Sequence, residues 1–173
     1  MTNLLDNPNF IKNLNCVSKK SVELARLLKE LPASGTVSMN NRKELVVFDH
    51  GEPCLNHIAP SAEALKRTET IRKTPPEILV VIGYAPVYHL QAILSSPSYP
   101  GKICLFEPDV TLLKNVMAQI DISQIFNDNR IFLAQSHQEM KRFLWQNYKH
   151  QDRVEIFSLP FYRKYYSQIV NGI

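Results

Sequence analysis

Residues 80–90 read VVIGYAPVYHL, and this stretch decides the fold. Apolar residues lead into Gly83, as in the strand and tight turn that open a nucleotide-binding βαβ unit. A dinucleotide or S-adenosylmethionine site would usually place two more small residues after this glycine, where the chain has Ala85 and Val87. The stretch therefore predicts the strand and turn of such a unit, with either a different ligand or a lost site.

The last hundred or so residues repeat the alternation that begins here. Continuous apolar runs, typical of strands covered on both faces, occur at Ile78–Ile82, Lys102–Phe106, Arg130–Leu133 and Val154–Phe157. Helical patterns separate them, at Val87–Leu94, Val110–Ile120 and His137–Tyr148. Strand and helix in alternation predict an α/β fold, with a Rossmann-like, mostly parallel sheet flanked by helices over residues 76–173.

Residues 1–75 have a different character and predict an N-terminal helical and β-hairpin cap. Leucines at helical spacing follow Ser21, a candidate N-cap, and predict a helix ending near Leu31. Residues 36–48 form two extended runs about Asn40-Asn41, which predicts a hairpin or a sheet edge. A further helix is expected from Ser61 to about Arg72, because prolines follow it.

Composition limits the classes of protein to which the chain can belong. A hydrophobic fraction of 45% over 173 residues is enough for a proper core. The net charge is +4, but the basic residues are dispersed, which disfavours nucleic acid as a partner. Three cysteines without paired spacing, with Cys104 in an apolar run, favour reduced thiols and a cytoplasmic location. We expect no signal peptide, because the N-terminus has no basic start and Asp6 and Pro8 break its apolar residues, and no membrane span, because no 18 apolar residues run together.

The candidate site lies where the first two predicted strands end. Ligands of open parallel sheets collect at the carboxyl ends of the strands, beside the N-termini of the following helices. Glu107 follows Gly83 at close to the roughly 20-residue offset at which a carboxylate meets a ribose hydroxyl. The layout suits a nucleoside-sized ligand. The candidate ligand-binding residues are Gly83, Tyr84, Ala85, Tyr88, His89, Glu107 and Asp109.

The same turn carries specific objections to phosphate binding. Ala85 adds a methyl group, Pro86 removes an N–H donor, and Val87 puts a branched side chain at the helix start. Each candidate also has a structural alternative. Gly83 can serve only a tight turn, and the Tyr88-His89 pair can either stack on a ligand or pack against the cap. Glu107 can belong to a capping arrangement, in which Asp109 is the N-cap of the next helix.

Two other segments have weaker functional interpretations. His50, Cys54 and His57 carry zinc-binding groups, but their spacing matches no closed site and a fourth ligand is missing, so we predict a polar loop and no metal site. The C-terminal segment mixes aromatic and basic residues, which can bind nucleic acid. Its aromatic residues have helical spacing, which favours packing on the sheet or on a neighbouring domain.

These strand-end residues resemble the N-terminal domain of the Maf (motility accessory factor) family of bacterial flagellin glycosyltransferases, related to the 6-hydroxymethylpterin diphosphokinase-like proteins. The family pattern runs G-x-G-x-G-Y-H after one strand and E-P-D after the next. The chain supplies Gly83, Tyr88, His89, Glu107, Pro108 and Asp109. Weaker likeness occurs at Ala59–Ala64 and at Leu159–Tyr162 with Tyr165-Tyr166. Ala85 and Val87 depart from the pattern, because they replace the second and third glycines.

The resemblance implies an accessory role. In Maf proteins a larger central domain follows this one and carries the transfer of nonulosonic acids, and this chain has no such domain. We therefore expect a truncated domain, or a short relative, that is not active alone. It would position partners, either flagellin or the missing catalytic domain, or a nucleotide-like ligand such as a CMP-sugar.

An S-adenosylmethionine-dependent methyltransferase is the alternative function. The predicted strand order suits such a methyltransferase as well, and Glu107 stands where its ribose-binding carboxylate would be. Leu159–Tyr162 is similar to the N-P-P-Y loop of amino methyltransferases. Against this alternative stand Ala85 and Val87 in the methionine-binding turn, and the lack of Asn or Asp before Pro160.

Overall fold

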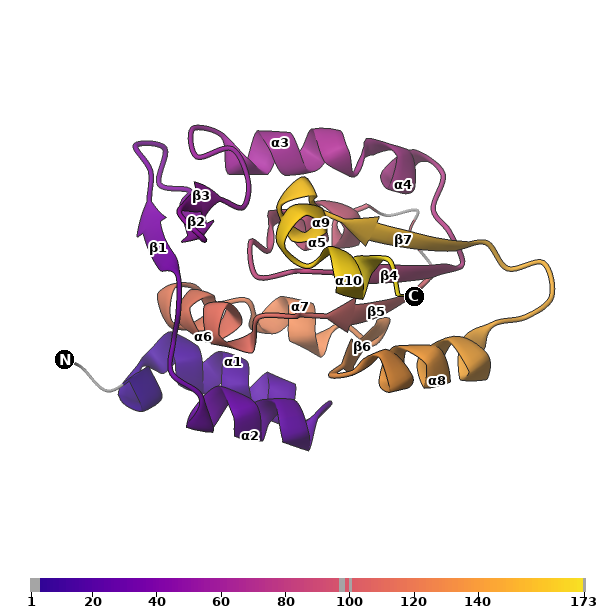
Figure 1. The fold of residues 1–173 in the computed structure, drawn as a ribbon, viewed down its shortest axis with the longest axis horizontal. Coiled ribbons are helices and arrows are strands. Elements are labelled where there is room, and N and C mark those ends of the chain that lie inside the picture. Colours follow the sequence, from indigo (N-terminus) through magenta and orange to yellow (C-terminus); the bar gives the residue numbers. More distant parts are fainter. Residues whose placement is uncertain (1–3, 97–98, 100, 173) are drawn as a thin grey trace.

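The computed structural model describes residues 4–96, 99 and 101–172. At its centre lies a four-stranded sheet in the order β6-β5-β4-β7, in which every neighbouring pair of strands is parallel. The strands are β4 (Ile78–Ile82), β5 (Lys102–Phe106), β6 (Ile131–Ala134) and β7 (Val154–Ser158). Helices flank this sheet (Figure 1), so the protein is a Rossmann-like α/β fold, as predicted.

The central strand β4 explains the continuous apolar run of the sequence. All five of its residues are buried. Leu79 and Val81 face a large hydrophobic cluster on one side of the sheet, and Ile78 and Val80 face a smaller cluster on the other. Both faces of the strand therefore need apolar side chains, which removes the usual alternation.

The helices between the strands were predicted to within one residue at each end. They are α5 (Tyr88–Leu94), α6 (Val110–Gln119) and α8 (His137–Asn147). Helices α5 and α6 pack on the larger cluster, whereas Met140 and Phe143 of α8 pack on the smaller one. A short helix that was not predicted, α7 (Ser123–Asn127), precedes β6.

Two N-terminal helices lie against α6. They are α1 (Pro8–Ser18) and α2 (Val22–Glu30), and a 3-10 turn, η1 (Leu4–Asp6), precedes them. Ser21 accepts a hydrogen bond from the Leu24 N–H, so it is the predicted N-cap of α2. Helix α1 was not predicted, although Asn7 caps it and Pro8 occupies its first turn.

The hairpin predicted over residues 36–48 is present. It comprises β1 (Thr36–Met39) and β2 (Leu45–Asp49), which β3 (Glu52–Pro53) extends to a three-stranded antiparallel sheet. The turn is stabilised by Asn40, whose Oδ1 accepts hydrogen bonds from the N–H groups of Arg42 and Glu44.

The helix expected from Ser61 to Arg72 is interrupted, which corrects the prediction of a single helix. The structure has α3 (Pro60–Arg67) and α4 (Glu69–Lys73) instead. Thr68 separates them: it is fully buried, and its hydroxyl donates a hydrogen bond to the Ala64 carbonyl. This hydroxyl competes with the helical ladder for that carbonyl. Residues 76–172 end in α9 (Pro160–Tyr165) and α10 (Ser167–Val170).

The cysteines Cys16, Cys54 and Cys104 are all buried and unbridged. Within the ranges that the structure describes, every helix is too short or too polar to cross a lipid bilayer.

Candidate functional site

The candidate site lies at the carboxyl ends of β4 and β5, where the structure brings the predicted residues together. Gly83 directly follows β4 with φ +80°, a conformation that favours glycine. A Cβ atom at this position would lie 2.2 Å from ring atoms of Tyr162 in α9. The glycine is thus required twice, once by its backbone and once by the aromatic ring that packs against it.

The Glu107 carboxylate occupies the turn after β4. Its Oε2 accepts hydrogen bonds from the N–H groups of Tyr84 and Ala85, both at 2.7 Å. The Tyr162 hydroxyl donates to the same oxygen at 3.1 Å, and the Asp109 N–H donates to Oε1 at 3.1 Å. Only 4% of Glu107 is exposed. The backbone donors that a phosphate would use are therefore already bound by a carboxyl group of the chain itself.

Burial governs the ionisation of this group. It raises the pKa of Glu107 to about 8, against the opposing effect of the backbone N–H groups of Asp109, Tyr84 and Ala85. Burial, together with the nearby Glu107, also raises the pKa of Tyr162 well above its usual range. The Tyr162 hydroxyl therefore stays protonated and can donate its hydrogen bond to Glu107.

His89 faces the interior beside the same turn. It is fully buried, its Nε2 lies 3.1 Å from the Gly83 carbonyl oxygen, and its ring stacks on Phe157. A protonated Nε2 donates to that carbonyl, which leaves Nδ1 as a buried acceptor that has no hydrogen-bond partner. Burial lowers the pKa of His89 to about 4, so the imidazole is neutral near pH 7.

The backbone at Val87 keeps a shape that suits glycine. Its φ is +44°, in the left-handed region that β-branched residues rarely adopt, and its side chain is fully buried. This is the position at which the Maf pattern has its third glycine. The turn therefore holds a β-branched residue in a backbone conformation that favours glycine.

Tyr88 makes its hydrogen bond to the N-terminal hairpin. Its hydroxyl oxygen accepts a hydrogen bond of 2.6 Å from the Leu45 N–H. Of the two roles considered for this residue, contact with the cap is the one present in the structure. The other candidates in the turn, Tyr84 and Ala85, are at most 1% exposed.

A second, more accessible group of side chains surrounds Asp109, and we call it the outer patch: Asp49, His50, Asp109, Tyr165 and Tyr166. Asp109 Oδ1 caps α6 by accepting hydrogen bonds from the N–H groups of Thr111 and Leu112, as predicted for the N-cap. The Tyr166 hydroxyl lies 3.4 Å from Asp109 Oδ2 and 3.5 Å from Asp49 Oδ2. These three residues come from the hairpin, the β5–α6 turn and the C-terminal helices.

His50, in the turn between β2 and β3, completes the outer patch. It has φ +50°, stacks on Tyr165 with ring centroids 4.4 Å apart, and places Nε2 3.6 Å from Asp49 Oδ2. Sequence reasoning placed Asp109 at the site, considered His50 only as a zinc ligand, and did not join either residue to Asp49 or to the two tyrosines, because these segments are far apart along the chain. Cys54, considered with His50 as a zinc ligand, is buried, and burial raises its pKa. Within the described ranges, no three metal-binding side chains come together.

Chemically, the site thus has a closed interior and an open rim. The Glu107 centre holds the turn after β4, the start of the β5–α6 turn and helix α9 together. The outer patch presents carboxylate, imidazole and phenol groups that can hydrogen-bond to a partner.

The sequence and the structure were compared with known proteins, and only the structure gave a match. No protein-family model matches the sequence. No curated protein of similar sequence was found. The solved structure of a Maf glycosyltransferase from Magnetospirillum magneticum AMB-1 superposes with a TM-score of 0.61 at 13% sequence identity. The match covers 95% of this chain and 34% of that one, so this chain spans about a third of the length of its neighbour. At that identity the likeness shows a shared fold, and this chain therefore has the fold of one part of a Maf glycosyltransferase.

Proposed function

We propose that this chain is an accessory module of a Maf-type flagellin glycosyltransferase system, and that it positions protein partners without catalysing the transfer itself. The observation that carries the proposal is the Glu107 carboxylate bound to the N–H groups of Tyr84 and Ala85. These donors would have to be released before a nucleotide phosphate could use them. A role that leaves the turn closed is therefore favoured over nucleotide binding.

The fold shared with a Maf glycosyltransferase supports the choice of system. The outer patch supports the choice of ligand, because it offers partly exposed polar and aromatic groups of the kind that bind protein surfaces. The nonulosonic acid donor, flagellin and the catalytic domain are inferred only from the likeness to Maf proteins.

Isothermal titration tests the proposal with three ligands: CMP, a CMP-sugar and flagellin. We expect saturable heat with flagellin and none with the two nucleotides. An Asp49→Ala, Tyr166→Phe double variant should weaken flagellin binding if the outer patch contributes. Binding of CMP together with silence of flagellin would reverse the proposal, and silence of all three would leave a structural role.

The methyltransferase alternative stays a prediction. Glu107 would have to turn outward to reach a ribose, whereas its acceptors are occupied by interior donors. A thermal shift with S-adenosylhomocysteine tests it directly: a rise of several degrees in Tm would favour a methyltransferase.

A further inference from the structure

Helix α8 keeps one face exposed, and that face is cationic. Met140 and Phe143 pack α8 against the sheet through the smaller cluster, so the opposite side of the helix faces solvent. On that side lie Lys141 and Arg142, and Lys149 follows just beyond the C-cap. None of these three side chains forms an ion pair within the ranges that the structure describes. The exposed residues between 136 and 151 include no carboxylate.

Two carboxylates lie near this face, and both are turned onto backbone groups. Glu139 Oε2 accepts a hydrogen bond of 2.8 Å from the Gln135 N–H, ahead of the helix. Asp152 Oδ2 accepts a hydrogen bond of 2.8 Å from the Lys149 N–H, in the loop after the helix. Residues 137–153 contain four basic residues and two acidic ones, so this region keeps a positive charge.

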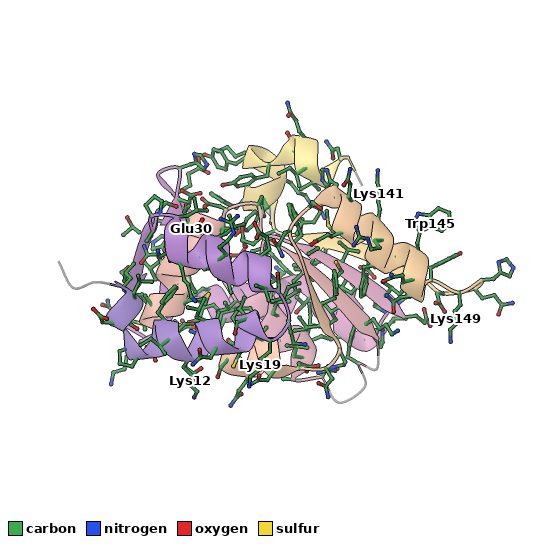
Figure 2. The ribbon with its side chains drawn as sticks, turned by 90° about the horizontal axis from the view of Figure 1, so that it is seen from below. Lys12, Lys19, Glu30, Lys141, Trp145 and Lys149 are labelled. Atoms are coloured by element: carbon green, nitrogen blue, oxygen red, sulfur yellow. The ribbon has the colours of Figure 1, made fainter. Side chains whose placement is uncertain are left out.

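An apolar hollow of about 470 Å³ opens at the C-terminal end of α8. It is lined by Leu144, Trp145, Tyr148 and Val154. Trp145 is 86% exposed, and Lys141 lies one helical turn before it on the same face. Figure 2 shows Lys141, Trp145 and Lys149 projecting outward from one side of the molecule. Cationic side chains thus flank an apolar hollow.

We propose that this face of α8 binds an acidic segment of a partner protein, with one leucine-sized side chain in the hollow and carboxylates directed toward Lys141 and Lys149. Burial of the apolar side chain beside Trp145 would supply affinity, and the lysines would orient the segment. Glu155 does not oppose such a segment. It lies on the other face of β7, in register with Leu79 of the larger cluster.

The hollow favours a protein segment over other anionic surfaces. A helix that lies on a membrane needs an apolar face for the lipid, and the apolar face of α8 already packs on the sheet. Single-stranded nucleic acid stacks its bases on aromatic rings along a cationic groove, but it has no aliphatic side chain to fill a hollow walled by Leu144 and Val154. A second copy of the same face would bring like charges together.

This inference goes beyond the proposed function, because it requires neither flagellin nor the outer patch. The two fail separately. An acidic peptide that binds α8 while flagellin is silent would overturn only the proposed function. Flagellin binding in the absence of any peptide binding at α8 would overturn only the present inference.

The fluorescence of Trp145 provides the readout, because it is the one tryptophan of the chain. A synthetic peptide with one leucine between two pairs of glutamates should shift the Trp145 emission to shorter wavelength in a saturable way. Replacement of that leucine by serine should weaken binding about tenfold, because the apolar contact is lost. Replacement of the glutamates by lysines should abolish binding. No saturable shift with the first peptide, or equal affinity of all three, would overturn the proposal.

A charge reversal tests the lysines beside the hollow. The Lys141→Glu, Lys149→Glu double variant should weaken the glutamate peptide about tenfold or more. The matched control is Lys19→Glu, Lys43→Glu, which reverses two exposed lysines at the end of α1 and in the hairpin turn and gives the same net charge. Its affinity for the peptide should stay near the wild-type value, and circular dichroism should show both variants folded. Equal losses would mean that net charge alone attracts the peptide, which overturns the proposal.

Three further titrations test the other occupants with the same readout. They use phosphatidylserine vesicles, a single-stranded oligouridylate, and the protein alone at rising concentration. The glutamate peptide should give the largest shift at equal concentration of added ligand. A larger shift with vesicles or RNA, or a shift caused by protein concentration alone, would assign the face to a membrane, a nucleic acid or a second copy. Each of these results overturns the proposal.

Discussion

Gly83 is required by both its backbone angle and its surroundings. Its φ of +80° excludes most side chains, and the Tyr162 ring fills the space where a Cβ would lie. Gly51 has a similar φ of +77°, but its Cβ would have no atom within 4 Å. Comparing substitutions at the two glycines therefore distinguishes the cost of backbone strain from the cost of steric overlap.

Gly83→Ala should lower the free energy of unfolding by about 3 kcal/mol or more, because overlap with Tyr162 adds to the cost of the left-handed backbone. Gly51→Ala should cost about 1 kcal/mol, from the backbone alone. Urea denaturation of both variants measures the difference. Equal losses would mean that Tyr162 moves aside freely.

Glu107 makes stability depend on pH. Its folded pKa of about 8 lies above the ordinary value of 4.5, so the folded state holds this proton more tightly. The resulting stabilisation is fully present below about pH 4.5 and is lost as the pH rises through about 8.

The free energy of unfolding should therefore fall by a few kcal/mol more in the wild type than in Glu107→Gln between pH 5 and pH 9, on the order expected from such a shift. Urea titrations at several pH values give the two profiles. Parallel profiles would show that Glu107 does not titrate in this window.

Among the helices, the cap of α6 links the fold to the candidate site. Asp109 binds the N–H groups of Thr111 and Leu112 through Oδ1, and directs Oδ2 toward Tyr166 and Ser34. One side chain therefore begins a helix and shapes the outer patch.

Asp109→Ala should destabilise the protein by about 1 kcal/mol through loss of the cap, and Asp109→Asn should cost much less, because asparagine also caps helices. Ser136→Ala at the start of α8 is the matched control, since Ser136 caps that helix through the Glu139 N–H. Thermal denaturation measures all three variants. An asparagine variant as unstable as the alanine variant would point to the charge of Asp109 instead of its cap.

At the scale of the whole molecule, the N-terminal helices share a hydrophobic cluster with the parallel sheet. Leu24 and Leu28 of α2 belong to the same cluster as Leu112 and Val116 of α6. Asn13 of α1, fully buried, joins the two regions with hydrogen bonds to backbone groups of Met117, Ile120 and Ile122. The division into units 1–75 and 76–173 stays a prediction, which cooperativity can test.

Asn13→Ala should lower the free energy of unfolding by roughly 3 kcal/mol, because it removes the partner of buried backbone groups. The loss should appear equally in far-UV circular dichroism and in the fluorescence of Trp145, which lies on the other side of the sheet. A fluorescence midpoint that stays at its wild-type value would show that the region around α1 unfolds independently.

The sequence by itself determined the parallel sheet, because four apolar runs and the helical patterns between them leave few alternative topologies. It also determined the caps at Ser21 and Asp109, where a side chain acts on its nearest neighbours. It missed α1, although Asn7 and Pro8 are local signals for its start, and it missed the interruption at Thr68, where burial turns the hydroxyl onto the Ala64 carbonyl.

Only the tertiary structure decided what the strand-end residues do. The spacing from Gly83 predicted Glu107 as a ligand-facing group, with a part in the capping arrangement of Asp109 as the structural alternative. The folded chain turns its carboxylate onto the N–H groups of Tyr84 and Ala85 and closes the turn with Tyr162. Hydrogen bonds across 55 residues of chain cannot be read from local patterns, because they depend on which surfaces packing brings together.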